Sequence, residues 1–208
     1  MNFIAKIQEQ HNIILASSSP RRKQLLSSIG LKFEIIPPNI DEKKLDNNIF
    51  DIPPQNYCQH LAISKAINVY HNNMELQYSK PQIIISADTI VVFENEIINK
   101  PKDNNEAILF LKKLSDNKHK VFTGVSILRS NDGKINCHYA ETDVYFRKLT
   151  NQEIIDYVST GSPLDKAGGY GIQDDYGCLF VKRINGCYYN VVGLPLQLLY
   201  KMLLVNCI

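Results

Sequence analysis

The chemistry of this chain is indicated by charged side chains that occur in or beside apolar and glycine-rich segments. The cations are Arg21, Arg22, Lys65, Lys100 and Lys166, and the carboxylates are Glu42 and Asp88. Carboxylates can hold a divalent metal and activate water, while cations can hold phosphate groups. This set is typical of a site for a metal and a polyphosphate. The motifs H-E-x-x-H, G-x-S-x-G and G-x-x-x-x-G-K-[ST] are absent.

Two of the cations begin a predicted helix. The stretch SSSPRRKQLL follows the apolar run IILA and predicts a strand, a turn and a helix, with Ser19 as N-cap and Pro20 in the first helical position. Cations are unfavourable at this helix end, by roughly 0.3–1 kcal/mol each. Either Arg21 and Arg22 are solvated and one pairs with a nearby acid, or they bind a phosphate together with the helix N-terminus. The serines from Ser17 onward would let such an anion approach closely.

Lys65 and Asp88 interrupt apolar patterns. Leu61, Lys65 and Val69 lie four residues apart, on one face of a predicted helix. The lysine either extends along the edge of that face to solvent or is an ammonium group held in a cleft. Asp88 lies inside the apolar run IIISADTIVVF, where a carboxylate is costly unless it meets a cation or a metal. The other interpretation is that Asp88 caps a strand or forms a turn.

Three further segments give weaker signals. Glu42 is a possible second carboxylate in PPNIDEKKL, although surface loops are rich in acids. Lys100 precedes Pro101, so its backbone is held extended, which can aim an ammonium group or be ordinary loop chemistry. The glycines of DKAGGYGIQD allow close approach of a ligand. In that loop Tyr170 would supply a flat surface and Gln173 an amide.

The pattern of elements predicts an α/β fold with a mixed sheet. Strands are expected near residues 13–16, 32–36 and 82–87, and helices near 20–29, 54–70 and 104–114. The sequence NDG predicts a hairpin, and Thr150 with Glu153 a capping box. Asn185-Gly186 predicts a second hairpin, between LFVKRI and CYYNVVG, and Pro195 opens the last helix. No linker or repeat divides the chain, so we expect a single domain.

Composition limits the class of protein. The chain has 208 residues, 44% of them hydrophobic, with a net charge of +2. This balance does not favour nucleic acid or an anionic membrane as the main partner. No apolar run approaches the roughly 18 residues of a membrane span, and no signal peptide is evident. The five cysteines include no C-x-x-C pair, which predicts reduced thiols and a cytoplasmic protein.

Five motifs in order resemble the Maf family of nucleoside triphosphate pyrophosphatases. They are LASSSPRRKQLL, SADTIVV, NKP, LDKAGGYGIQ and INGCYYNVVGLPL, and the resemblance runs from about Ile13 to Leu199. It implies a house-cleaning hydrolase that cuts a nucleoside triphosphate between the α- and β-phosphates with a divalent metal, Mg²⁺ or Mn²⁺. It also implies a strongly bent mixed sheet flanked by helices around a deep cleft, similar to inosine-triphosphate pyrophosphatases. Residues 13–208 would form this domain, and residues 1–12 an N-terminal extension.

The resemblance also implies roles for individual residues. Asp88 matches the proton acceptor of the family, and the other catalytic positions match Glu42, Lys65 and Lys100. The specificity positions match Arg21, Thr89 and Gln173. The metal ligands would be Glu42 and Asp88. The residues that bind phosphate would be Ser17, Arg21, Arg22, Lys65, Lys100 and Lys166.

Thr89 and Gln173 resemble the subgroup that acts on dTTP and UTP. Members that act on 7-methyl-GTP differ at these positions, with Gln after the aspartate and an acid near position 173. A Gln amide can donate and accept hydrogen bonds, which suits the edge of uracil or thymine. Modified pyrimidine triphosphates are the alternative targets. Two other functions are alternatives. One is a regulator of cell division and septum formation that binds nucleotide with little turnover, and the other is a phosphate-binding module. The resemblance also suggests a homodimer, although no interface can be located in the sequence.

Overall fold

The computed structural model describes residues 3–40, 52–73, 78–173 and 176–206. The chain divides into two compact units, and each unit has a hydrophobic core of its own. The first unit consists of Met1–Asp88, Thr123–Tyr139 and Gly193–Ile208, and the second of Thr89–Phe122 and Ala140–Val192. Glu42, one of the two predicted carboxylates of the site, lies outside the described residues.

The strands form a mixed sheet of seven strands, which confirms the predicted α/β class. Their order is β2-β1-β3-β5-β6-β7, with β4 paired to β3. The strands are β1 (Asn12–Leu15), β2 (Glu34–Ile35), β3 (Gln82–Phe93), β4 (Glu96–Ile98), β5 (Lys118–Arg129), β6 (Ile135–Phe146) and β7 (Val181–Asn185). β1 pairs in parallel with β2 and β3, whereas β4 pairs antiparallel with β3, and β7 with β6.

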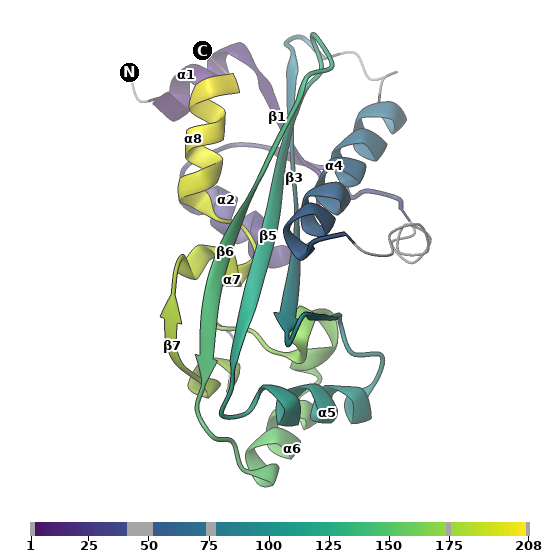
Figure 1. Ribbon diagram of the computed structural model, residues 1–208. Coiled ribbons are helices and arrows are strands. Elements are labelled where there is room, and N and C mark those ends of the chain that lie inside the picture. Colours follow the sequence, from purple (N-terminus) through teal and green to yellow (C-terminus); the bar gives the residue numbers. More distant parts are fainter. Residues whose placement is uncertain (1–2, 41–51, 74–77, 174–175, 207–208) are drawn as a thin grey trace. The chain divides into compact units, whose positions relative to one another are not determined.

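Helices cover both faces of the sheet in the first unit (Figure 1). They are α1 (Phe3–Gln10), α2 (Pro20–Ser28), α4 (Pro54–Asn72) and α8 (Leu196–Asn206). Side chains alternate between the two faces of a strand. Ile83 and Ile85 of β3 therefore pack with α1, α2 and α8, while Ile84 packs with Ala66 and Val69 of α4. The predicted N-terminal extension includes α1, which contributes Ile7 to this core.

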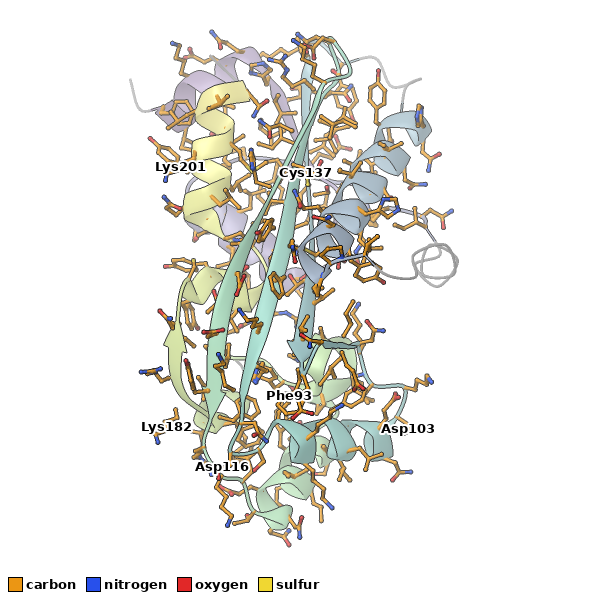
Figure 2. The ribbon with its side chains drawn as sticks, viewed as in Figure 1. Phe93, Asp103, Asp116, Cys137, Lys182 and Lys201 are labelled. Atoms are coloured by element: carbon orange, nitrogen blue, oxygen red, sulfur yellow. The ribbon has the colours of Figure 1, made fainter. Side chains whose placement is uncertain are left out.

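The second unit packs its helices against the remaining parts of β3, β5 and β6. These are α5 (Asn104–Leu114), α6 (Asn151–Ser159) and α7 (Tyr188–Val192), with short 3₁₀ turns at Ser162–Asp165, Ala167–Gly169 and Gly177–Phe180. Asp103 is the N-cap of α5 and lies just before the helix (Figure 2). Its side chain accepts a hydrogen bond from the Glu106 N–H at 2.9 Å. Tyr157 of α6 is fully buried and stacks edge to face on Phe180, with ring centroids 5.1 Å apart.

Two local predictions are confirmed by the backbone. The NDG turn joins β5 to β6, which are neighbours in the sheet, and the Arg129 N–H donates to the carbonyl of Lys134 at 3.0 Å. Thr150 and Glu153 form the capping box of α6, in which the side chain of each accepts from the backbone N–H of the other. Local sequence signals of this kind need no tertiary context.

The second predicted hairpin is wrong, because the residues after Asn185-Gly186 form helix α7 instead of a strand. The Cys187 N–H donates to Thr142 Oγ1 of β6, at 3.0 Å. The amide of Asn190 donates to the Val121 carbonyl at 3.0 Å and to Thr142 Oγ1 at 2.9 Å. These bonds attach the segment to β5 and β6 through side chains, and contacts far apart in sequence override the local turn signal.

The four described cysteines form no disulfide with one another. Cys58 of α4 is buried, Cys137 of β6 and Cys187 are half-buried, and Cys178 is exposed. Cys137 lies on the part of β6 that belongs to the first unit (Figure 2). Among the described residues, no helix combines the length and the apolar character needed to cross a membrane.

Candidate active site

A buried ion pair between Lys65 and Asp88 is the central feature of the candidate site. Lys65 Nζ donates a hydrogen bond to Asp88 Oδ1, and each residue is only 7% exposed. A buried carboxylate is costly unless a cation compensates it, and each charge here compensates the other. The lysine therefore does not extend to solvent. Asp88 lies within β3 and neither caps a strand nor forms a turn.

Regular periodicity brings the two charges together. Ile84, Ser86 and Asp88 alternate along β3 and face the same side as α4, because Ile84 belongs to the core under that helix. On α4, Lys65 lies one turn from Leu61 and from Val69, both of them buried. An apolar face of the helix and an apolar face of the strand thus each contribute one charge at the same place.

The beginning of α2 is built as the sequence predicts, but Arg22 has an additional partner. Ser19 is the N-cap and accepts from the Arg22 N–H at 3.5 Å. The guanidinium of Arg22 donates through Nε to the Gly193 carbonyl at 2.9 Å and through Nη1 to Ser17 Oγ at 3.4 Å. Arg22 is therefore neither a freely solvated arginine nor paired only with an anion. Arg21 is half-buried in the same turn.

Gly193 was not identified from the sequence, although it belongs to the motif NVVGLP. Its carbonyl accepts a hydrogen bond from Arg22, which lies 171 positions away in the sequence. A backbone acceptor leaves no residue-type signal. Only the position of the motif could have indicated it.

The second unit holds the other predicted site residues. Thr89 follows Asp88 in β3 and is half-buried, and Lys100 is exposed. Lys166 is buried, and its Nζ donates to the Ser162 carbonyl at 2.6 Å and to Asp165 Oδ1 at 2.7 Å. These contacts attach Lys166 to the 3₁₀ turn that precedes it.

The glycine-rich loop after Lys166 contains Gln173, the residue predicted to recognise the base. Gln173 is half-buried, and its Oε1 is buried without a hydrogen-bond partner in the part of the chain that the structure describes. Gly168 has a φ of +72°, and a Cβ there would lie 3.0 Å from a methyl group of Val91, so both conformation and space require glycine.

The expectation that Tyr170 offers a flat surface to a ligand is wrong. Tyr170 is buried in the core of the second unit, where its hydroxyl lies 2.7 Å from His119 Nε2. Burial lowers the pKa of His119 to about 3 and raises the pKa of Tyr170. No role for His119 can be read from the sequence, because its position in the alternating segment HKVFTGV is compatible with an ordinary strand.

Comparison with known proteins identifies the family. The family model described as "Maf-like protein" matches residues 12–205. The chain belongs to the Maf family. This Maf protein is 45% identical to a dTTP/UTP pyrophosphatase of Caldicellulosiruptor saccharolyticus over 191 residues, which cover 92% of each chain. It is 45% identical to the dTTP/UTP pyrophosphatase of Clostridium botulinum strain Kyoto, over 93% of this chain and 96% of that one.

A dTTP/UTP pyrophosphatase of Thermoanaerobacter sp. strain X514 is 43% identical over 92% of this Maf protein and 94% of the relative. Among solved structures, the Staphylococcus aureus Ham1 protein matches with a TM-score of 0.43 and 15% identity, over 94% of this chain and 99% of that chain. The three pyrophosphatases correspond to this Maf protein along 92–96% of their length.

The described residues of this Maf protein do not form a metal cage of their own. No three side chains of His, Cys, Asp or Glu gather in a group that could hold a metal ion, as far as the described ranges extend. A buried carboxylate next to an ammonium group instead fits a metal that is held mainly by a substrate. Mg²⁺ usually keeps several waters and binds one or two carboxylates together with substrate phosphates.

Proposed function

We propose that this protein hydrolyses dTTP and UTP, and modified pyrimidine triphosphates, to the nucleoside monophosphate and pyrophosphate. The observation that carries the proposal is its identity of 43–45% with dTTP/UTP pyrophosphatases along almost the whole chain. The buried Lys65–Asp88 pair supports turnover over binding alone. Proton transfer from water requires a carboxylate, whereas binding of a triphosphate requires only cations and N–H donors.

Asp88 is the group that takes the proton of the attacking water. One water is consumed, the anhydride bond between the α- and β-phosphates breaks, and the leaving pyrophosphate carries the electron pair of that bond. The ammonium of Lys65 balances the charge of the carboxylate and fixes its orientation through the hydrogen bond to Oδ1. General-base help of this kind contributes about 10²–10⁴-fold to the rate.

The N-terminus of α2 binds phosphate. Its first N–H groups and the two arginines supply positive charge, which favours an anion at this end of a helix. Because Arg22 is attached to Gly193 and Ser17, its guanidinium is held in one orientation before substrate arrives. A group that is already ordered loses less entropy on binding. Lys100, Lys166 and Glu42 remain proposed members of the substrate site.

Gln173 recognises the base, together with Thr89. The buried Oε1 of Gln173 lacks a hydrogen-bond partner among the described residues, and such an acceptor is unfavourable until a donor reaches it. The N–H of uracil or thymine lies between two carbonyls and is a donor of the required kind. The amide N–H of the same side chain can donate to one of those carbonyls.

The divalent metal is Mg²⁺ or Mn²⁺, and Asp88 with Glu42 would hold it. When bound, the metal neutralises phosphate charge in the transition state. The single buried carboxylate of Asp88 fits a metal that takes most of its ligands from the triphosphate and from water.

The test is a panel of dTTP, UTP, CTP and GTP with Mg²⁺ and then Mn²⁺, in which pyrophosphate and nucleoside monophosphate are both quantified. We expect equal amounts of the two products from dTTP and UTP, and much lower kcat/KM for GTP. Release of inorganic phosphate with formation of a diphosphate would contradict the proposed position of cleavage. Binding of dTTP without either product would favour a regulatory protein.

A further inference from the structure

Helix α4 lies unusually close to the sheet at two points. Gly124 of β5 is one of them: a Cβ at this position would lie 2.4 Å from the Cys58 carbonyl oxygen and 2.7 Å from the Gln59 backbone nitrogen. No side chain larger than hydrogen fits against backbone at such distances. The second point is Ser86 of β3, whose fully buried hydroxyl donates to the Ala62 carbonyl of α4 at 2.6 Å.

Both contacts lie on the face of α4 that is turned to the sheet, close to Lys65. Cys58, Ala62 and Ala66 are spaced four residues apart on α4, and all three are fully buried. Lys65 follows Ala62 by three residues, less than one turn, and Asp88 follows Ser86 by two residues on the same face of β3. The contacts therefore fix α4 and β3 directly beside Lys65 and Asp88.

We propose that Ser86 and Gly124 are positioning residues, which set the height of α4 on the sheet and so place Lys65 Nζ against Asp88. Gly124 sets how closely the helix backbone approaches. The hydroxyl of Ser86 sets where along β3 the helix rests. The inference rests on the proposed function only in that the ion pair is used for hydrolysis, because the geometry of the pair can be measured without turnover.

A stabilising role alone would not explain why the contact is polar. The Ala62 carbonyl already has an acceptor role within α4, because residue 66 belongs to the same helix. Removal of the Ser86 hydroxyl would therefore leave no buried carbonyl unpaired, and the cost in stability should be small. The principal loss should be in the position of Lys65.

The chain offers a matched control in Ser126. Ser126 lies two residues after Gly124 on β5, on the same face of the sheet, and is also fully buried. Its hydroxyl has no hydrogen-bond partner within the described part of the chain. Ser126→Ala thus removes an equally buried hydroxyl from the same face without removing a contact to α4.

The experiment compares Ser86→Ala, Ser126→Ala and wild type by steady-state kinetics with dTTP. We expect Ser86→Ala to lower kcat about 10–100-fold, since displacement of a catalytic group by about 1 Å costs up to that much. KM should change by less than about threefold, because uniform binding of substrate is not affected. Ser86→Cys, with a weaker donor of similar shape, should restore part of kcat, and Ser126→Ala should match wild type.

A double-mutant cycle tests whether Ser86 acts through Lys65. In a Lys65→Met background, Ser86→Ala should cause little further loss of kcat, because the group that it positions is already absent. Equal factors in both backgrounds would overturn the inference. Gly124→Ala should reduce kcat more than Ser86→Ala does. If Gly124→Ala fails to fold, the Ser86 variants still decide.

Crystal structures of the Ser86→Ala and Ser126→Ala proteins give a readout that does not depend on turnover. The contact between Lys65 Nζ and Asp88 should be lost or lengthened in the first variant and kept in the second. An unchanged ion pair in Ser86→Ala would overturn the inference even if wild type hydrolyses dTTP. A wild type without turnover, together with a displaced Lys65 in Ser86→Ala, would overturn only the proposed function.

Discussion

At the scale of single residues, Lys65 and Asp88 show how a polar pair can be hidden in an apolar pattern. Each residue alone has an ordinary interpretation, and only the structure shows that each accounts for the burial of the other. A buried ion pair contributes little net stability compared with an apolar pair of similar volume. The proposed role of the pair in hydrolysis therefore accounts for its presence in the core better than a gain in folding stability does.

Asp88→Asn should remove most turnover while the fold persists. Asn keeps the shape and can still accept a hydrogen bond from Lys65, but it cannot take a proton from water. We expect kcat for dTTP to fall about 10²–10⁴-fold. Pyrophosphate release at saturating dTTP is the measurement. The control is Asp143→Asn, which changes an aspartate of β6 that pairs with Lys118 and Lys120 outside the proposed site and should leave kcat unchanged.

Gln173→Glu should weaken the preference for pyrimidines. The variant keeps the shape of the side chain but loses its donor and gains a charge, so a carbonyl of uracil or thymine would face a carboxylate. Leaving that acceptor unpaired costs roughly 1–3 kcal/mol, which corresponds to a fall of about 10–100-fold in kcat/KM. GTP, which presents donors, should lose less than dTTP and UTP. An equal fall for dTTP, UTP, CTP and GTP would mean that Gln173 shapes its loop and does not recognise the base.

At the scale of elements, the first turn of α2 combines favourable capping residues with two arginines that the helix dipole disfavours. Its N-terminus follows ordinary capping rules, with Ser19 as N-cap and Pro20 as the first helical residue. Two arginines then follow, against the preference of the helix dipole. The contact of Arg22 with Gly193 explains one of them without a ligand. The sequence predicted the helix and its cap, but it could not predict a partner that is a backbone carbonyl far along the chain.

Arg22→Ala should therefore lower stability as well as affinity. The loss of a hydrogen bond from a charged donor costs about 1.5–3 kcal/mol, and relief of dipole repulsion returns about 0.3–1 kcal/mol. We expect the free energy of unfolding without ligand to fall by roughly 1–2 kcal/mol, the difference of these terms, and KM for dTTP to rise. Urea denaturation checks the first and kinetics the second.

Lys23 provides the control for this prediction. It is an exposed cation in the same helix, so Lys23→Ala removes a charge of the same sign near the same helix end. Stability should be unchanged or slightly higher, by a few tenths of a kcal/mol. If the two variants change the free energy of unfolding equally, the contact of Arg22 with Gly193 contributes nothing to stability. Arg22 would then act only through its charge, as the sequence alone suggests.

At the scale of the whole molecule, the sequence predicted the family, the mixed sheet, the NDG hairpin and the capping box of α6. These rest on local signals or on motifs that survive without tertiary information. Predictions from the sequence were wrong where distant contacts decide. Residues 188–192, predicted as a strand, form helix α7, and Asn190 of this helix bonds to β5 and β6. Tyr170, predicted to face a ligand, is buried against His119 in the core. The bent sheet, the deep cleft, the metal and the homodimer stay predictions.

The buried His119 should make stability depend on pH. Its pKa is lowered from 6.5 to about 3 by burial, so the folded protein keeps a neutral imidazole where the unfolded chain binds a proton. Stability from this group is complete above pH 6.5 and falls as pH falls from 6.5 toward about 3, by at most about 1.4 kcal/mol per pH unit. Above this window the histidine contributes no pH dependence.

His119→Gln isolates this contribution. Gln can still meet the Tyr170 hydroxyl but does not titrate. The difference in free energy of unfolding between wild type and variant, measured by urea denaturation from pH 4.5 to 7.5, should shrink as pH falls through the histidine window. Parallel curves for the two proteins would mean that the imidazole of His119 has the same pKa in the folded protein as in the unfolded chain.

Two shielded thiols in the first unit allow opening of that unit to be measured by chemical labelling. Burial raises the pKa of Cys58 to about 12 and that of Cys137 to about 11, whereas the thiol of Cys178 in the second unit is exposed. Since only thiolates react with alkylating and disulfide reagents, Cys58 can be modified only when α4 leaves the sheet. Its labelling rate in the native protein therefore reports how often that helix opens, and a nucleotide that stabilises the closed state should slow it.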